Sequence, residues 1–240
     1  MLTRRLRSID LRDEEGFSLP ELLVAIIIGT IIALAAFGLL DTAIGVGTKV
    51  NKRVDATQRG RTAMALIVRD LRSQVCLPGD TPIGSLRAGS DTSVDVYTDL
   101  GNGSAATPPQ RRTITFDAAG RRITESIYTP TGSAGSYVFP TTPTATRTLL
   151  TDVVQDGTTP VFRYYPVDTT PDDDTQSPAA LAASSGLLAT SLDDVARIVV
   201  VFKVFPAGST VAGGRTVVLQ DEVYRRAIDP NATDPTPECW

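Results

Sequence analysis

Glu21 is the side chain whose position in the sequence most suggests chemistry, because it borders a long apolar stretch. Residues 22–40 contain no charged residue across nineteen positions. A carboxylate at the edge of such a stretch is unfavourable in lipid unless it has a partner. Glu21 is therefore a candidate for an ion pair with a positive group nearby. The alternative is a glutamate that only reaches out to the membrane interface.

Residues that support catalysis are sparse. The chain has no histidine, which removes the usual general base near neutral pH and the commonest metal ligand. Its two cysteines, Cys76 and Cys239, cannot form a four-ligand zinc site alone. There is no G-x-x-x-x-G-K-[ST] phosphate loop and no G-x-S-x-G elbow. The sequence therefore predicts a protein that is not an enzyme, with no cofactor and no metal.

Two other polar patterns have simple interpretations. The run Asp172-Asp173-Asp174 could ligate calcium through its oxygens. Because it lies among Pro, Ser and Thr residues, we interpret it as solvated charge instead. Asn231-Ala232-Thr233 matches the N-glycosylation sequon, and we assign it no function.

The apolar stretch that follows Glu21 is long enough for a membrane. At about 1.5 Å per residue, residues 22–40 form roughly 28 Å of helix, which crosses a bilayer core. Four arginines precede it, which predicts a cytoplasmic N-terminus. Two alternatives are a cleaved secretory signal, with Ala33-Leu34-Ala35 as the cleavage site, and a plain membrane anchor. A lipoprotein signal is excluded because no cysteine lies near the stretch.

Residues 16–25, GFSLPELLVA, closely resemble the prepilin processing motif of type IV pilins, type II secretion pseudopilins and competence pseudopilins. The resemblance implies that a prepilin peptidase cuts between Gly16 and Phe17 and that the new amino group of Phe17 is methylated. A glycine permits the close backbone approach that a protease needs. The apolar segment is then retained, and Glu21 pairs with the amine of Phe17 on an adjacent subunit.

The charges beyond the apolar stretch are distributed unevenly. Residues 41–75 carry seven Lys or Arg and three Asp, a net charge of +4, whereas residues 77–240 carry twelve basic and nineteen acidic residues, a net charge of −7. An acidic C-terminal region argues against a nucleic-acid partner. The basic segment could lie near anionic lipid headgroups or pair with acidic regions of neighbouring subunits.

A single long helix is predicted from Phe17 to about Val75. From Val50 onward, eight residues at steps of four and three form one stripe along the helix, interrupted by Thr57 and Arg61. We expect the part from Met64 to Val75 to pack on its own head domain. Pro78-Gly79 then ends the helix. The stripe consists of Val50, Val54, Thr57, Arg61, Met64, Val68, Leu71 and Val75.

After residue 78 the chain becomes rich in Thr, Ser, Pro, Gly and Asp, with short alternating apolar runs. A helix followed by antiparallel strands predicts an α+β fold. One hairpin is predicted around Ala118-Ala119-Gly120, and another joins the last two strands. The expected strands are Val94–Thr98, Arg112–Asp117, Arg121–Tyr128, Thr148–Val154, Val161–Tyr165, Val195–Phe205 and Thr216–Arg225.

Cys76 and Cys239 are a candidate disulfide. Export of the head would place both residues where disulfides persist. The bond would close a loop of about 160 residues and contribute several kcal/mol on the entropic account. Two free thiols are the alternative, because a sequence does not show proximity.

Together these features predict a pilin-like subunit with four parts. They are a leader (residues 1–16), a transmembrane half-helix (17–40), an amphipathic half-helix (41–76) and an exported, β-rich head (77–240). Arg69-Asp70-Leu71-Arg72 and the last hairpin also look like the larger minor pilins and J-type minor pseudopilins. The resemblance implies a non-enzymatic subunit of a type IV pilus or secretion filament, with other pilins, the peptidase and membrane lipid as partners. The alternative is a filament-tip subunit for adhesion or DNA uptake. The expected location is the inner membrane, with the head exported, and then the filament.

Overall fold

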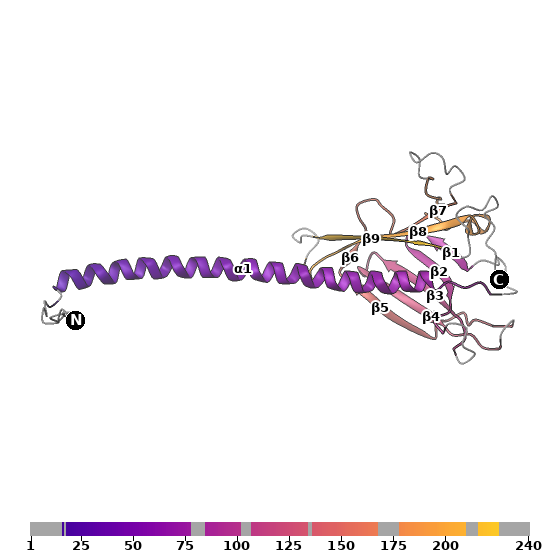
Figure 1. Ribbon diagram of the computed structural model, residues 1–240, viewed down its shortest axis with the longest axis horizontal. Coiled ribbons are helices and arrows are strands. Elements are labelled where there is room, and N and C mark those ends of the chain that lie inside the picture. The colour runs from indigo at the N-terminus through magenta and orange to yellow at the C-terminus, as the bar shows by residue number, and fades with distance from the viewer. Residues whose placement is uncertain are drawn as a thin grey trace, which may run out of the picture. The chain divides into compact units, whose positions relative to one another are not determined.

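The computed structural model describes residues 16, 18–77, 85–101, 107–133, 136–167, 178–209 and 216–225. The chain divides into two compact units, residues 1–50 and residues 51–240. Helix α1 (Leu19–Arg72) contributes residues to both. Figure 1 shows this helix and the strands of the second unit.

In the first unit, the described part of the chain is almost entirely helix. Every residue of α1 up to Val50 is exposed, and this part includes an apolar window long enough to cross a membrane. Its hydroxyl groups need no outside partner, because Thr30 donates to the carbonyl of Ile27 (2.8 Å) and Thr42 to that of Gly38 (2.9 Å). The sequence prediction of a long N-terminal helix is confirmed.

The second unit contains a five-stranded antiparallel sheet whose strands follow one another in sequence order. The predicted hairpin is confirmed, since β3 and β4 pair from Arg111–Tyr128 to Asp117–Arg122. In its turn, the Asp117 carboxylate accepts the backbone N–H of Gly120 at 2.9 Å, which lowers the pKa of Asp117. The strands are β1 (Leu86–Ser90), β2 (Ser93–Thr98), β3 (Gln110–Asp117), β4 (Arg122–Tyr128) and β5 (Ala145–Thr151).

A second antiparallel sheet is built around the ten-residue strand β8, which pairs with β6, β7 and β9. The predicted pairing of the last two strands is confirmed over eight residue pairs, from Arg197–Tyr224 to Val204–Val217. A short helix, α2, precedes β8. The elements are β6 (Val153–Val154), β7 (Phe162–Pro166), α2 (Ala189–Leu192), β8 (Val195–Val204) and β9 (Val217–Tyr224).

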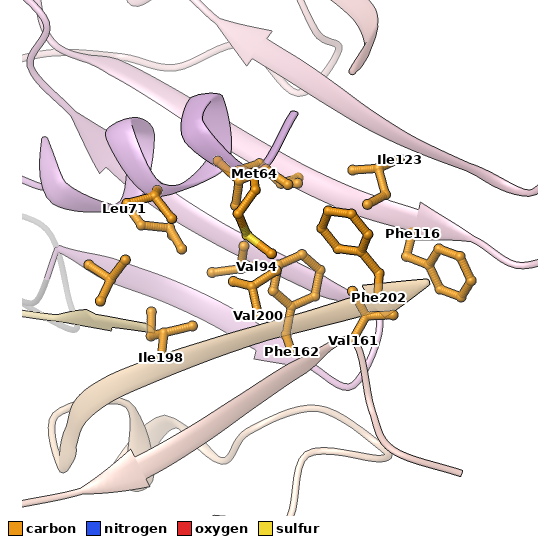
Figure 2. Packing of buried hydrophobic residues seen from close by; sticks show 14 of the residues in the cluster. Met64, Leu71, Val94, Phe116, Ile123, Val161, Phe162, Ile198, Val200 and Phe202 are labelled. Atoms are coloured by element: carbon orange, nitrogen blue, oxygen red, sulfur yellow. The ribbon is translucent and has the colours of Figure 1, made fainter. Parts of the chain in front are cut away.

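The hydrophobic core of the second unit is shared by α1 and both sheets. Figure 2 shows Met64 of α1 with Phe162 and Phe202 of the second sheet, and Leu71 of α1 and Ile123 of the first sheet on opposite sides of this group. These side chains are almost fully buried. The expectation that α1 packs on its own head from Met64 onward is thus confirmed.

The buried face of α1 differs from the predicted stripe at its N-terminal side. Val54 is 48% exposed, whereas Ala56, Gly60 and Ala63 are buried. A Cβ atom at Gly60 would come within 2.9 Å of a methyl carbon of Val204 and would also clash with Leu219. The buried face of α1 therefore starts with small residues, because these let the second sheet come close to the helix backbone.

Three local predictions differ from the structure. Helix α1 ends at Arg72 rather than near Val75, because the chain then turns to pair with β2: the N–H of Val75 donates to the carbonyl of Tyr97 (3.0 Å). The predicted strand Thr148–Val154 is split at Asp152, whose φ of 57° carries the chain from one sheet to the other. Strand β1 was not predicted at all.

Candidate functional site

The described N-terminal residues form an open helix start. Gly16 is exposed, and a Cβ atom placed on it would meet nothing within 4 Å. The carbonyl of Ser18 accepts the N–H groups of Glu21 (3.0 Å) and Leu22 (3.1 Å) and so closes the first turn. Pro20 fits this turn because its missing N–H would have no partner inside the helix. Among the described residues, none therefore crowds the backbone at Gly16.

Glu21 lies in the first turn of α1 and is exposed. An acidic side chain in this position is favoured by the partial positive charge of the helix N-terminus. No described residue forms an ion pair with Glu21. Phe17, whose amino group is the predicted partner, lies outside the described residues, so this pairing stays a prediction.

The apolar residues that follow Glu21 are not covered by any described residue of the first unit. Ile26, Ile31, Leu34 and Phe37 are each more than half exposed. So many large exposed apolar side chains require lipid or other helices around them. This half-helix is therefore built to be covered by something outside the fold that the structure describes.

At the other end of α1, a cluster of charged side chains is buried against the first sheet. Asp70 and Glu125 are fully buried and Arg112 is 6% exposed. One nitrogen of Arg112, Nη1, lies 2.5 Å from a Glu125 oxygen and 3.4 Å from an Asp70 oxygen. Thus a single guanidinium from β3 joins a carboxylate of the helix to a carboxylate of β4.

Further polar groups complete this cluster. Arg69 bonds the second oxygen of Asp70 at 2.9 Å, Arg147 of β5 donates to Glu125, and Gln110 accepts from Arg112 at 2.7 Å. Burial raises the pKa of Asp70 above its ordinary value of 3.8, and the charge of Glu125 raises it further. The arrangement joins the end of α1 to three strands of the first sheet.

This cluster was not predicted, although the sequence contains a signal for it. In β3, Arg112 is in phase with the buried residues Ile114 and Phe116, and in β4 Glu125 is in phase with Ile123. A charge that keeps the period of the apolar residues is expected to face the core. The matching charge on Asp70 could not be assigned from the sequence, because it lies 42 residues from Arg112.

The remaining sequence candidates have different outcomes. Cys76 is disulfide-bonded, but Cys239 lies outside the described residues, so their pairing stays a prediction. Asp172, Asp173 and Asp174, as well as the sequon at Asn231, also lie outside. Among the described residues, no group of three or more His, Cys, Asp or Glu side chains could hold a metal ion.

Comparison with known proteins gives one finding. Residues 11–37 match the family model described as the prokaryotic N-terminal methylation motif. No curated protein matches the chain. The matched segment contains Gly16, the first turn of α1 and all four of the exposed apolar residues named above.

Proposed function

Because the chain carries the prepilin signature of type IV pilins and pseudopilins, we propose that it is a minor structural subunit of a type IV pilus or a type II secretion-like filament. A prepilin peptidase cuts it between Gly16 and Phe17, and the amine of Phe17 is methylated. Residues 1–16 are then the leader, and residues 77–240 form the exported head. The single observation that carries the proposal is the methylation motif at residues 11–37, which includes the start of an exposed apolar half-helix.

The assembly step follows from the physical properties of this helix. In the inner membrane, the exposed apolar side chains are covered by lipid, and in the filament they pack against helices of other pilins. Small residues at four-residue spacing, Ala25, Gly29 and Ala33, allow such helices to approach closely. Glu21 pairs with the amine of Phe17 on the neighbouring subunit, so the pair compensates a carboxylate that is otherwise unfavourable in an apolar environment.

The assignment to a minor rather than a major subunit rests on two features. The helix passes through Gly38, Gly45 and Gly47 without a proline, whereas many major type IV pilins have a proline near this position. The head is also large and is built from two sheets. A structural role without catalysis agrees with the absence of a catalytic set in the sequence.

N-terminal analysis of the mature protein tests the proposal. The protein purified from membranes should begin at Phe17 and carry a methylated amine. Gly16→Val should leave the uncut precursor in the membrane, because a branched side chain blocks the backbone approach at the scissile bond. A mature protein that begins near Ala36 would show instead that the apolar stretch is a secretory signal.

A further inference from the structure

Helix α1 has two opposite faces within residues 51–72. One face is buried in the core and includes Gly60, Met64 and Ile67. The other is exposed and includes Arg61, Ala65, Arg69 and Arg72, which are spaced by four, four and three residues and therefore lie on one side of the helix. We call these four residues the arginine face.

The charges on the arginine face are only partly compensated by the chain itself. Elsewhere on the helix, Arg59 pairs with Asp55 at 3.0 Å, and on the face Arg69 pairs with Asp70 at 2.9 Å. No described residue forms an ion pair with Arg61 or Arg72. Two arginines, separated by about 16 Å of helix, thus point outward without an acidic partner among the described residues.

An open groove of about 540 Å³ lies next to the arginine face. Ala65, Val68, Arg69, Arg72 and Ser73 line it on the helix side. The remaining lining residues, Asp99 and Asp221, are acidic, and Asp221 already accepts the N–H of Glu222 at 2.8 Å. Because these two carboxylates repel an anion, an acidic partner fits on the helix side, against Arg61 and Arg72, and not deep in the groove.

We propose that the arginine face docks an acidic surface on the head of a neighbouring pilin-like subunit. The proposal rests on the filament role proposed above and names one contact between subunits. Charge complementarity supports it, because residues 77–240 of this chain carry a net charge of −7, so the head of a second copy of the chain supplies the acidic groups.

Anionic lipid is the other possible partner for exposed arginines, but the composition of the face argues against it. A helix that lies on a membrane needs large apolar side chains beside its cations. The positions between Arg61 and Arg72 on this face carry only Thr62, Ala65 and Arg69. Such a surface has little to insert into a bilayer and is suited to polar contact with protein.

Photo-crosslinking in the host cell tests the proposal. A photo-reactive amino acid replaces exposed Ala65 in the full-length chain, and adducts are identified by mass spectrometry. The expected product joins position 65 to the head of a second pilin-like subunit. The double variant Arg61→Gln/Arg72→Gln should lower its yield at least about threefold, since two exposed ion pairs are removed. The control Arg122→Gln removes one exposed arginine of the first sheet and should leave the yield unchanged.

Any other outcome contradicts the proposed contact between the arginine face and a neighbouring head. Adducts only with lipid, adducts only within the same chain, the absence of adducts, or a yield that the double variant does not change would all contradict it. The mature N-terminus is determined in the same samples. A chain correctly cut before Phe17 that gives no adduct refutes only the arginine face, whereas an uncut chain refutes the proposed function itself.

Discussion

The two halves of helix α1 differ in whether their apolar side chains are exposed or buried. Residues 19–50 carry large apolar side chains that are all exposed. Residues 51–72 bury small side chains first, at Ala56, Gly60 and Ala63, and larger ones later, at Met64 and Ile67. A large apolar side chain therefore does not by itself mark the core of this protein.

The difference shows where each half finds its partners. The second half finds them in its own two sheets, so that substitutions on its buried face change the stability of the head. The described part of the first half has none inside its unit, so substitutions there should leave the head intact and act on membrane insertion or assembly. Substitutions in each half of the helix, and in the sheet that packs on it, test this division.

Arg112→Met should destabilise the head by about 3–5 kcal/mol, because it leaves the buried carboxylates of Asp70 and Glu125 without the cation between them. Chemical denaturation of the chain in detergent, followed by near-ultraviolet circular dichroism, measures the loss. The control Arg122→Met removes a half-exposed arginine and should cost less than about 1 kcal/mol. Equal losses in both variants would show that the buried cluster does not hold the helix on the sheet.

Gly60→Val should destabilise the head by about 1–3 kcal/mol, because the new side chain meets Val204 and Leu219. Gly29→Val is its matched control in the other half of the same helix, where a Cβ atom meets nothing within 4 Å. In the same denaturation experiment, the head of the Gly29→Val variant should be as stable as the head of the wild type. The division between the halves fails if Gly29→Val unfolds the head as easily as Gly60→Val.

Asp70→Asn should change how stability depends on pH, with a smaller effect than the two substitutions above. The pKa of Asp70 is raised in the folded chain, so the folded state binds this proton more tightly than the unfolded state does. The contribution of Asp70 to the wild-type stability should therefore fall as pH rises above about 3.8, until Asp70 is ionised in both states. The amide of the variant cannot titrate, so stability measured from about pH 3 to 8 should decline less in the variant. A steeper decline in the variant would contradict the raised pKa.

Glu21→Ala should leave the stability of the head unchanged, because Glu21 belongs to the first unit and is not part of the hydrophobic core of the second. It should still be processed before Phe17 but enter filaments poorly, since the proposed charge pair is lost. Immunoblotting of sheared filaments and of membranes measures the two pools. Normal incorporation into filaments would show that assembly does not require Glu21 and depends on the apolar contacts alone.

Much of the fold could be predicted from local patterns. The long helix, the hairpin of β3 and β4 and the pairing of β8 with β9 all followed from periodicity and turn residues. Strand β1, Leu86–Ser90, was missed because Gly89 and two polar residues hide its pattern. The break at Asp152 was missed because its positive φ comes from the change of sheet and not from a glycine or proline signal.

The sequence alone was enough to recognise the N-terminal methylation motif and the apolar run, because each is a contiguous stretch of the chain. Only the tertiary structure joined Asp70, Arg112 and Glu125, which lie on a helix and two strands. It also decided which helix positions face the core, since Gly60 is buried and Arg61 is exposed next to it. The physical reason is that a buried charge is stable only beside its partners, and the fold chooses those partners from distant parts of the chain.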